Sequence, residues 1–393
     1  MGTSANKPNI RFGGFGGDWE RRKFGDLGTV AMCKRIFKEQ TTTEGDIPFY
    51  KIGTFGGEPD AFISRELFEE YKEKFSYPNI GDMLISASGT IGRTVEYTGE
   101  DEYFQDSNIV WFKHEERIDN AFLKCLYSIV KWLGIEGSTI KRLYNDNFLK
   151  TEFLLPSVEE QQQLGQHFRN LDNLITLQQR KLEALKETKK AMLQKMFPQE
   201  GQTAPEVRFK GFSDAWEQRK LGDVATFING RAYSQPELLS SGKYKVLRVG
   251  NFYTNDSWYY SDLELGEKYY ADYGDLLYTW SATFGPHIWL GDRVIYHYHI
   301  WKIDLSNQLE KQFAVQLLEQ DKANILSSKN GSTMVHITKE GMEQKDVIIP
   351  PSTKEQQEIG AFFQQLDNLI TLHQRKLEAL QQIKKGMLQQ MFV

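Results

Sequence analysis

Cysteine is scarce in this chain of 393 residues, which contains only Cys33 and Cys125 and no CxxC pair. This scarcity argues against a disulfide-stapled secreted domain and indicates a reducing compartment. We expect both cysteines to be small buried apolar side chains. No apolar run approaches the roughly 20 residues needed to cross a membrane. The polar start up to Ile10, expected to be loose, lacks the pattern of a secretory signal. The sequence therefore predicts a cytoplasmic protein without a membrane partner.

Catalytic motifs are also missing. The sequence has no Asn-Pro-Pro-Tyr-type base pocket and no GxxxxGK[ST] phosphate loop. The glycine-rich stretch 13–17 has no strand before it and no helix after it, which indicates a flexible lead. His297 and His299 would share a strand face, but no cysteine or carboxylate completes a metal site, so ordinary strand packing is favoured over metal binding. We expect no catalytic residues and no metal site.

An excess of positive charge is absent too. The chain has 48 Lys and Arg residues against 53 Asp and Glu residues, a net charge of −5. That balance argues against strong non-specific nucleic-acid binding, which depends on cations that neutralise phosphates. The whole-chain charge is an average, however, within which a local basic strip can lie. We expect this chain to bind nucleic acid poorly without help.

What the chain does contain is a duplication from end to end. The sequence LDNLITL at 171–177 returns unchanged at 366–372. The repeat predicts two pseudo-repeated globular α/β modules and two long helices, an α+β fold overall. The expected order is module one with a loose lead (1–157), helix one (158–197), a linker (198–207), module two (208–351) and helix two (352–393). The modules have diverged heavily, whereas the helices have barely changed.

Both helices carry an apolar residue at alternating steps of four and three, with Gln178, Lys189, His373 and Lys384 as polar members of the same frame. Sustained over four heptads, this pattern predicts a coiled-coil seam. A solitary helix of this kind would expose an aggregating stripe, so we expect the two helices to pair within the chain. The expected seam residues are Leu164, Phe168, Leu171, Ile175, Leu182, Leu185, Met192, Met196, Ile359, Phe363, Leu366, Ile370, Leu377, Leu380, Met387 and Met391.

Connectivity predicts the direction of the pair. A helix of about 35 residues is roughly 52 Å long, whereas a module of this size has a radius of gyration of about 15 Å. Module two could not easily carry the chain back along the whole helix, so the helices should run antiparallel, with a module at each end of a rod. A plain internal brace is the alternative. Two modules that differ from each other, held on a spacer, suit two DNA half-sites of different sequence. Such half-sites lie roughly 34–36 Å apart when separated by one helical turn.

A doubled signature gives the chain a family resemblance. Its first copy comprises Pro156, Glu160, Gln161, Gln162, Leu171, Asp172, Ile175, Lys181, Leu182, Lys190, Met192 and Leu193. The second copy comprises Pro350, Glu355, Gln356, Gln357, Leu366, Asp367, Ile370, Lys376, Leu377, Lys385, Met387 and Leu388. The pattern resembles the conserved region of specificity subunits of type I restriction–modification systems, and the resemblance spans the chain.

The resemblance implies a function. Each module would be a target recognition domain that reads one half of a bipartite, asymmetric double-stranded DNA site. The antiparallel helices would set the gap between the halves and dock two methyltransferase subunits. Restriction subunits would complete an ATP-dependent nuclease. The chain would be a non-catalytic subunit of a restriction endonuclease and adenine-DNA methyltransferase complex. S-adenosylmethionine, ATP and Mg²⁺ would belong to the partner subunits, with no cofactor on this chain.

Candidate DNA contacts follow from comparing the two modules. Lys51 and Arg248 occupy matching places before a glycine, and a shared cation suits phosphate positioning. Thr54 and Asn251, three residues further on, differ between the modules, which suits base discrimination. An exposed turn explains this segment equally well.

The other candidates lie at three places, each with a plain structural alternative. They are Ser88, Thr90 and Arg93 with the matching Ser281 and Thr283; Lys141 and Arg142 with the matching His336; and Tyr253. The first group suits a phosphate-binding loop or an ordinary hairpin, and the hairpin is favoured. The charge at 141–142, which module two lacks, indicates a module-specific contact or drift. The aromatic stretch that begins at Tyr253 favours core packing over base stacking.

A different class of function competes with recognition: a coiled-coil scaffold that positions two protein clients and never reads DNA. Divergence confined to the modules favours recognition, whereas the acidic pI of about 5.9 mildly favours the scaffold. A self-contained methyltransferase–nuclease lacks the necessary motifs.

Overall fold

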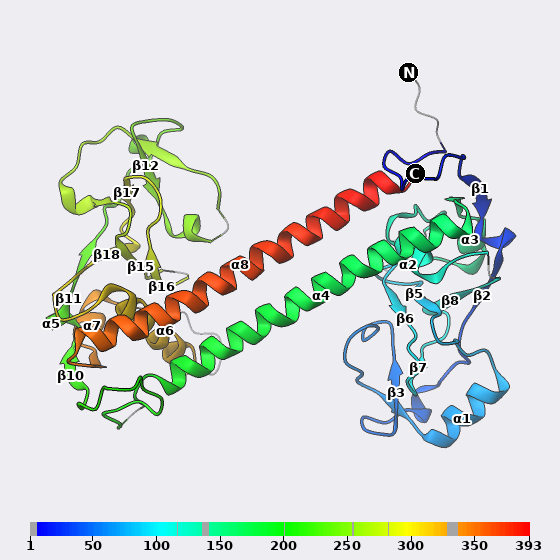
Figure 1. The fold of residues 1–393 in the computed structure, drawn as a ribbon, viewed down its shortest axis with the longest axis horizontal. Helices are drawn as coiled ribbons and strands as arrows, with labels where there is room; N and C mark the ends of the chain where they lie inside the picture. The colour runs from blue at the N-terminus through cyan, green and yellow to red at the C-terminus, as the bar shows by residue number, and fades with distance from the viewer. Residues whose placement is uncertain are drawn as a thin grey trace. The chain divides into compact units, whose positions relative to one another are not determined.

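The structure is a computed structural model that describes residues 6–115, 117–135, 141–199, 201–253, 255–281, 283–327 and 337–393. The chain divides into two compact units: Met1–Gln179 with Arg375–Val393, and Arg180–Gln374. Each unit contains one module and a part of each long helix, so the divisions lie within the helices (Figure 1). Among the described residues, no helix is both long and apolar enough to cross a membrane.

The module of the first unit contains two sheets and a short ribbon. The larger sheet has the order β2-β8-β5-β6 and is antiparallel throughout. In the smaller sheet, β4-β3-β7, strands β3 and β7 run parallel. The ribbon pairs β1 with β9. The strands are β1 (Glu20–Lys23), β2 (Gly28–Ala31), β3 (Ile47–Tyr50), β4 (Phe62–Ile63), β5 (Met83–Ser86), β6 (Thr94–Glu96), β7 (Tyr103–Phe104), β8 (Ile109–His114) and β9 (Glu152–Leu155). The helices are η1 (Phe24–Asp26), η2 (Lys38–Gln40), α1 (Arg65–Lys74), α2 (Asn120–Ile129) and α3 (Asn145–Lys150).

The module of the second unit repeats this plan. Its larger sheet has the order β11-β18-β15-β16, and its smaller sheet, β13-β12-β17-β14, again contains one parallel pair, β12 with β17. The ribbon pairs β10 with β19. The strands are β10 (Glu217–Lys220), β11 (Ala225–Asn229), β12 (Tyr244–Leu247), β13 (Tyr259–Ser261), β14 (Tyr270–Ala271), β15 (Leu276–Thr279), β16 (Gly285–Ile288), β17 (Val294–Tyr296), β18 (Ile300–Leu305) and β19 (Asp346–Ile349). The helices are α5 (Leu221–Val224), η3 (Gln235–Glu237), η4 (Val249–Phe252), η5 (Glu267–Tyr269), α6 (Lys311–Ser327) and α7 (Lys339–Glu343).

The central strands of the larger sheet in each module are largely buried on both faces, which explains their near-continuous apolar sequences. In β8, Val110 and Phe112 face the core beside α2, whereas Ile109 and Trp111 face the core under the smaller sheet. Successive side chains of a strand point to opposite faces, so one strand supplies two cores. The same division holds in β18. There Trp301 faces the core beside α6, whereas Ile300 faces the core under the smaller sheet. Both cysteines are buried as expected, and burial raises the pKa of each thiol to about 12.

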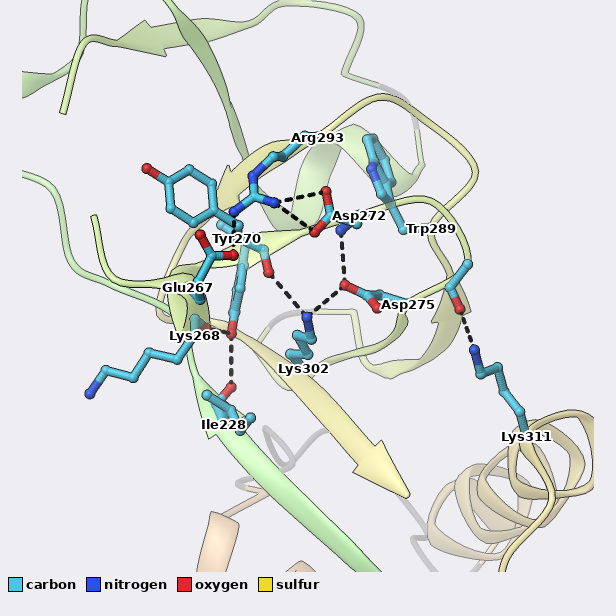
Figure 2. A network of polar contacts seen from close by, with 12 residues as sticks. Ile228, Glu267, Lys268, Tyr270, Asp272, Asp275, Trp289, Arg293, Lys302 and Lys311 are labelled. Atoms are coloured by element: carbon cyan, nitrogen blue, oxygen red, sulfur yellow. Dashed lines mark hydrogen bonds and ion pairs between the residues drawn. The ribbon is translucent and has the colours of Figure 1, made fainter. Parts of the chain in front are cut away.

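A polar network ties the smaller sheet of module two to its neighbours (Figure 2). The Nζ of Lys302 on β18 lies 2.8 Å from Asp275 and donates to the carbonyl of Tyr270 at 3.3 Å. The guanidinium of Arg293 reaches both Glu267 and Asp272. These cations are engaged within the fold.

The two long helices, α4 (Val158–Lys195) and α8 (Thr353–Met391), run antiparallel in both units. In the first unit, His167 contacts Met387 at 3.2 Å, while Asp172, further along α4, contacts Lys384, which is earlier in α8. The same reversal occurs in the second unit. There Lys189 pairs with Asp367, and the ring of Phe197, just after α4, lies 6.2 Å from the ring of Phe363. The predicted fold class, two repeated α/β modules with an antiparallel helix pair, is confirmed.

The expected seam residues differ in burial. Buried members are Leu164, Phe168, Leu171, Leu182, Met196, Ile359, Phe363, Leu366, Leu377 and Met391. Partly buried members are Ile175, Leu185, Met192, Ile370, Leu380 and Met387. Several of the buried members, Phe168 and Phe363 among them, also belong to the module cores. One stripe therefore packs on the partner helix and on a module.

The Glu-Gln part of the repeated signature joins each module to its helix. Gln161 is fully buried, its amide nitrogen donates to the carbonyls of Arg117 and Pro156, and its oxygen accepts from the backbone of Asp119. Glu160, with 1% of its side chain exposed, binds the guanidinium of Arg11 through two bonds of 2.6 Å. Buried polar groups need such partners, which explains why the chain repeats these residues. Gln356, Glu355 and Arg208 form the same contacts in the second unit.

This junction corrects the expectation of a loose lead. From Asn6 onward the lead is held, because Ile10 donates its backbone N–H to the carbonyl of Gln390 and Trp19 donates to that of Asn6. In the linker, Val207 donates to Lys195 and Trp216 to Thr203 in the same manner. The lead and the linker are therefore equivalent parts of the repeat.

Candidate nucleic-acid interface

Hydrogen bonds gather four loops of module one into what we call the loop face of module one, residues 51–55, 87–93, 105–108 and 141–142. The backbone N–H of Ile52 donates to Oε1 of Gln105 at 2.9 Å. Ser88 donates to Oδ1 of Asn108 at 2.7 Å and forms a β-bridge with Arg142. These bonds bring together chain segments that lie far apart in the sequence.

The first pair of candidates in module one is engaged within its own turn. Thr54 Oγ1 accepts the backbone N–H of Lys51 at 3.1 Å. The ammonium of Lys51, whose side chain is 40% exposed, pairs with Asp60 at 2.8 Å. An exposed pair of this kind is weak, so Lys51 is available for a phosphate.

The remaining candidates of module one lie around this turn. Arg93 donates to the carbonyl of Phe55 at 2.9 Å, which joins the β5–β6 hairpin to the turn. Thr90 is exposed at the tip of that hairpin. Lys141 and Arg142 are exposed, and neither forms an ion pair within the part of the chain that is described. The loop face therefore carries free positive charge in module one.

In module two, Asn251 takes the structural role of Thr54. Its Oδ1 accepts the backbone N–H of Arg248 at 3.1 Å, and its Nδ2 donates to the carbonyls of Asn255 and Ser257 at 2.9 Å. Both polar groups of Asn251 are thus engaged within its loop. This engagement favours the turn interpretation over base discrimination for Thr54 and Asn251.

Arg248 keeps the place of Lys51. Its guanidinium lies 4.3 Å from the ring centroid of Tyr259 and donates to Ser257. Tyr253, 42% exposed, places its hydroxyl 3.1 Å from Nε2 of His287. Ser281 and Thr283 lie in the β15–β16 hairpin, while His336 lies outside the described residues.

Sequence reasoning missed a cluster in module two that surrounds the β17–β18 connection. Arg231 exchanges backbone hydrogen bonds with Tyr296 and Tyr298, and its guanidinium lies 5.1 Å from the ring of Tyr233. That ring stacks at 6.5 Å on His297. The expectation of His297 and His299 on one strand is corrected, because β17 ends at Tyr296 and a turn follows. Only the run of ring-bearing residues 296–299 could have signalled this cluster.

His287 and His297 of module two are uncharged near neutral pH. Burial lowers the pKa of His297 to about 4, with further contributions from His299 and Arg248. Burial, together with Lys322, also lowers the pKa of His287 to about 4. Neutral imidazoles donate at one nitrogen and accept at the other, so these rings offer hydrogen bonds without charge. Among the described residues, no group of three or more His, Cys, Asp or Glu could hold a metal ion.

Comparison with known proteins decides the family. The family described as "Type I restriction modification DNA specificity domain" matches residues 16–187 and again residues 213–382. The chain belongs to this family. The doubled match agrees with the duplication, and the resemblance noted in the sequence is confirmed.

Relatives and solved structures agree with this membership. A putative type I restriction enzyme specificity subunit of Haemophilus influenzae, S.HindORF215P, is 57% identical over 158 residues, which cover 39% of this chain and 41% of the relative, less than half of its length. The putative MjaX specificity subunit of Methanocaldococcus jannaschii is 23% identical over 94% of this chain and 91% of its own. The structure of a type I S subunit from M. genitalium has the same fold, with a TM-score of 0.64, 14% identity and coverage of 98% of this chain and 99% of that one. A second structure, from work on the assembly of the type I restriction–modification system, has a TM-score of 0.54 at 14% identity and covers 94% of this chain and 96% of its own.

Proposed function

We propose that this chain is the DNA-recognition subunit of a type I restriction–modification complex, in which each module reads one half of a bipartite, asymmetric site. One observation carries the proposal: the modules share the strand order of the larger sheet, the helix junction and a cation at 51 and 248, yet differ in the side chains around that cation. A constant framework suits contacts to phosphates, and a varied surface suits contacts to bases.

We further propose that the paired helices hold the two readers at a fixed separation and bind two methyltransferase subunits. Leu174 and Leu177 are each 46% exposed on α4, and Leu369 and Leu372 are 42% and 46% exposed on α8. The seam needs only Leu171, Ile175 and their counterparts, so seam packing does not account for these leucines. Exposed apolar groups repeated in this way suit one partner that binds twice.

The chemistry would then reside in the partners. S-adenosylmethionine would bind to the methyltransferase subunits, and ATP and Mg²⁺ would serve the restriction subunits. This chain would supply sequence recognition and docking surfaces alone.

The test of recognition is methylation mapping. The chain is co-expressed with a methyltransferase subunit of its system, and modified adenines are located across the host genome. We expect one bipartite sequence with unlike halves. Absence of methylation at any sequence, with the complex intact, would favour the scaffold alternative.

Exchange of one module sharpens the test. Replacing residues 214–350 by the corresponding module of another family member should change one half of the sequence and leave the other half and the gap unchanged. A simultaneous change in both halves would contradict independent reading.

Docking is tested separately by the charge substitutions Leu174→Glu with Leu177→Glu, and by the matched pair Leu369→Glu with Leu372→Glu. Each pair should remove one of the two methyltransferase subunits, as measured by the mass of the purified complex. The exposed Thr176→Glu serves as the control and should keep both. Retention of two subunits by both leucine variants would place the docking surface elsewhere.

A further inference from the structure

We propose that the connection between β7 and β8 (105–108) and the connection between β17 and β18 (297–299) select the bases that each module reads, with Asp106 and Tyr298 as the reading side chains. The proposal rests on the proposed function and adds the element and residues that give each module its specificity.

The two connections occupy the same place in the fold. Each follows the strand that runs parallel to β3 or β12. At its start, Gln105 donates its backbone N–H to Tyr50, and His297 donates to Leu247, both at 2.9 Å. Each connection then enters the buried central strand β8 or β18. Both ends are fixed by the framework, which holds the residues between them in position.

The chemistry of the two connections nevertheless differs completely. Module one carries Gln-Asp-Ser-Asn, and module two carries the shorter His-Tyr-His. The neighbouring cations Lys51 and Arg248, in contrast, are alike in charge. A variable segment beside a constant cation is the arrangement expected where the segment contacts bases and the cation binds a phosphate.

In module one, the members of the connection other than Asp106 serve the fold. Gln105 and Asn108 each accept a hydrogen bond from a neighbouring loop, and Ser107 adopts a positive φ of 54°. The half-buried carboxylate of Asp106 forms no ion pair or side-chain hydrogen bond within the described residues. A carboxylate accepts hydrogen bonds and donates none, so it selects an exocyclic amino group, N4 of cytosine or N6 of adenine. The exposed cations Lys141 and Arg142 lie on the same loop face and offset the repulsion between this carboxylate and phosphates.

In module two, Tyr298 is held in a cluster of tilted aromatic rings. Its ring lies 3.9 Å from that of His299 and 4.4 Å from that of His297, and its carbonyl accepts from Nε1 of Trp280 at 2.9 Å. Tyr298 is nevertheless 39% exposed. A rigid aromatic side chain with a polar tip provides contact area at small entropic cost. The lowered pKa of His297 keeps the imidazole beside Tyr298 uncharged at neutral pH.

Polar atoms without a hydrogen-bond partner among the described residues lie beside this aromatic cluster. Nη1 of Arg231, the hydroxyl of Tyr233 and Nε of Arg248 are buried and have no hydrogen-bond partner among the described residues. Arg231 and Tyr233 contact the connection, and Arg248 lies close enough to His297 to lower its pKa. Buried polar atoms of this kind are rare without a partner, which points to a polar ligand at this face.

The experiment uses the complex of this chain with its methyltransferase subunit and compares Asp106→Ala with Lys51→Ala in module one. Asp106→Ala should relax the preference at one base pair of one half-site by about 5- to 150-fold, with the other half unchanged. Lys51→Ala should weaken binding to all sequences equally and reduce the salt dependence of binding. The exposed carboxylate variant Glu44→Ala is the control, with unchanged recognition. Tyr298→Ala should alter the other half-site only.

The outcomes separate this inference from the proposed function. Wild-type protein that directs no bipartite methylation would overturn both. A wild-type bipartite target that Asp106→Ala and Tyr298→Ala leave unaltered would overturn the inference alone. If Asp106→Ala abolishes all methylation, the variant Asp106→Asn distinguishes a role of Asp106 in base recognition from a role in the fold. A changed base preference of the Asn variant supports the inference, whereas unaltered recognition, or a second complete loss, assigns Asp106 to the fold.

Discussion

The Nζ of Lys384 lies 2.5 Å from Oδ1 of Asp172 between the antiparallel helices of the first unit. Lys189 and Asp367 repeat the contact at 2.5 Å in the second unit. Both lysines occupy polar positions of the heptad frame, where an unpaired ammonium would oppose burial of the seam. An aspartate next to a seam leucine of the partner helix neutralises each one. The paired charges thereby favour one antiparallel register.

Reversal of both charges tests this register. Lys384→Asp alone places two carboxylates together and should destabilise the helix pair, whereas Lys384→Asp with Asp172→Lys should recover most of the loss. Because these side chains are partly exposed, we expect a coupling energy of up to about 1 kcal/mol. Denaturant unfolding of the four members of the mutant cycle measures it. Strictly additive effects would remove the pair from the determinants of register.

The two long helices and their seam could be predicted from the sequence because periodicity is a local property. Heptad spacing identified the seam, and the two lysines stood out as polar members of the same frame. Asp172 and Asp367, which neutralise them, lie one position after a seam leucine and were recognised only as parts of a motif. Their partners lie 212 and 178 residues away in the sequence. Such pairs depend on register, which the spacing within one helix does not specify.

Removal of Arg11 tests the junction between module and helix. Arg11→Ala would leave the carboxylate of Glu160, with 1% of its side chain exposed, without its bidentate partner. Loss of one member of a buried ion pair costs about 3–5 kcal/mol. We expect a loss of this order in chemical unfolding of the first unit.

The matched variant Arg208→Ala should cost less than Arg11→Ala. In the second unit, Nε1 of Trp216 also donates to Oε1 of Glu355, at 3.3 Å. The corresponding Nε1 of Trp19 has no partner among the described residues. A remaining donor lowers the penalty of a buried carboxylate. Equal losses in the two variants would show that the tryptophan bond contributes little.

Three glycines within the long helices give a test with an internal control. A Cβ at Gly165 would lie 2.7 Å from Cβ of Ala121, and one at Gly360 would lie 2.8 Å from the backbone nitrogen of Phe313. Both alanine variants should therefore destabilise the contact between helix and module. Gly386 has no neighbouring atom within 4 Å of such a Cβ, so Gly386→Ala should stabilise α8 by up to about 1 kcal/mol. Thermal unfolding should give opposite signs, and stabilisation at Gly165 would contradict the close approach.

The loop face was less accessible to sequence reasoning than the helices. Comparison of the repeats located the cations Lys51 and Arg248, because each precedes a glycine in the same frame. For Thr54 and Asn251 it left base discrimination and an exposed turn equally favoured, and the structure favours the turn. The β17–β18 connection was missed because a run of aromatic residues favours strand packing, and only the backbone shows that β17 ends before His297.

The half-buried His287 and His297 of module two predict a dependence of stability on pH. Burial lowers the pKa of His287 and of His297 to about 4, below the usual value of 6.5 in the unfolded chain. The unfolded chain therefore binds more protons between these values, and the free energy of unfolding should decrease as the pH falls from about 6.5 towards 4. Each histidine contributes at most about 1.4 kcal/mol per pH unit. His287→Phe, which keeps the stacking on Phe252 at 4.2 Å, should reduce the slope in denaturant titrations across this range. The exposed residue variant Glu44→Ala should leave it unchanged, and an unaltered slope in His287→Phe would show that His287 does not titrate as its burial implies.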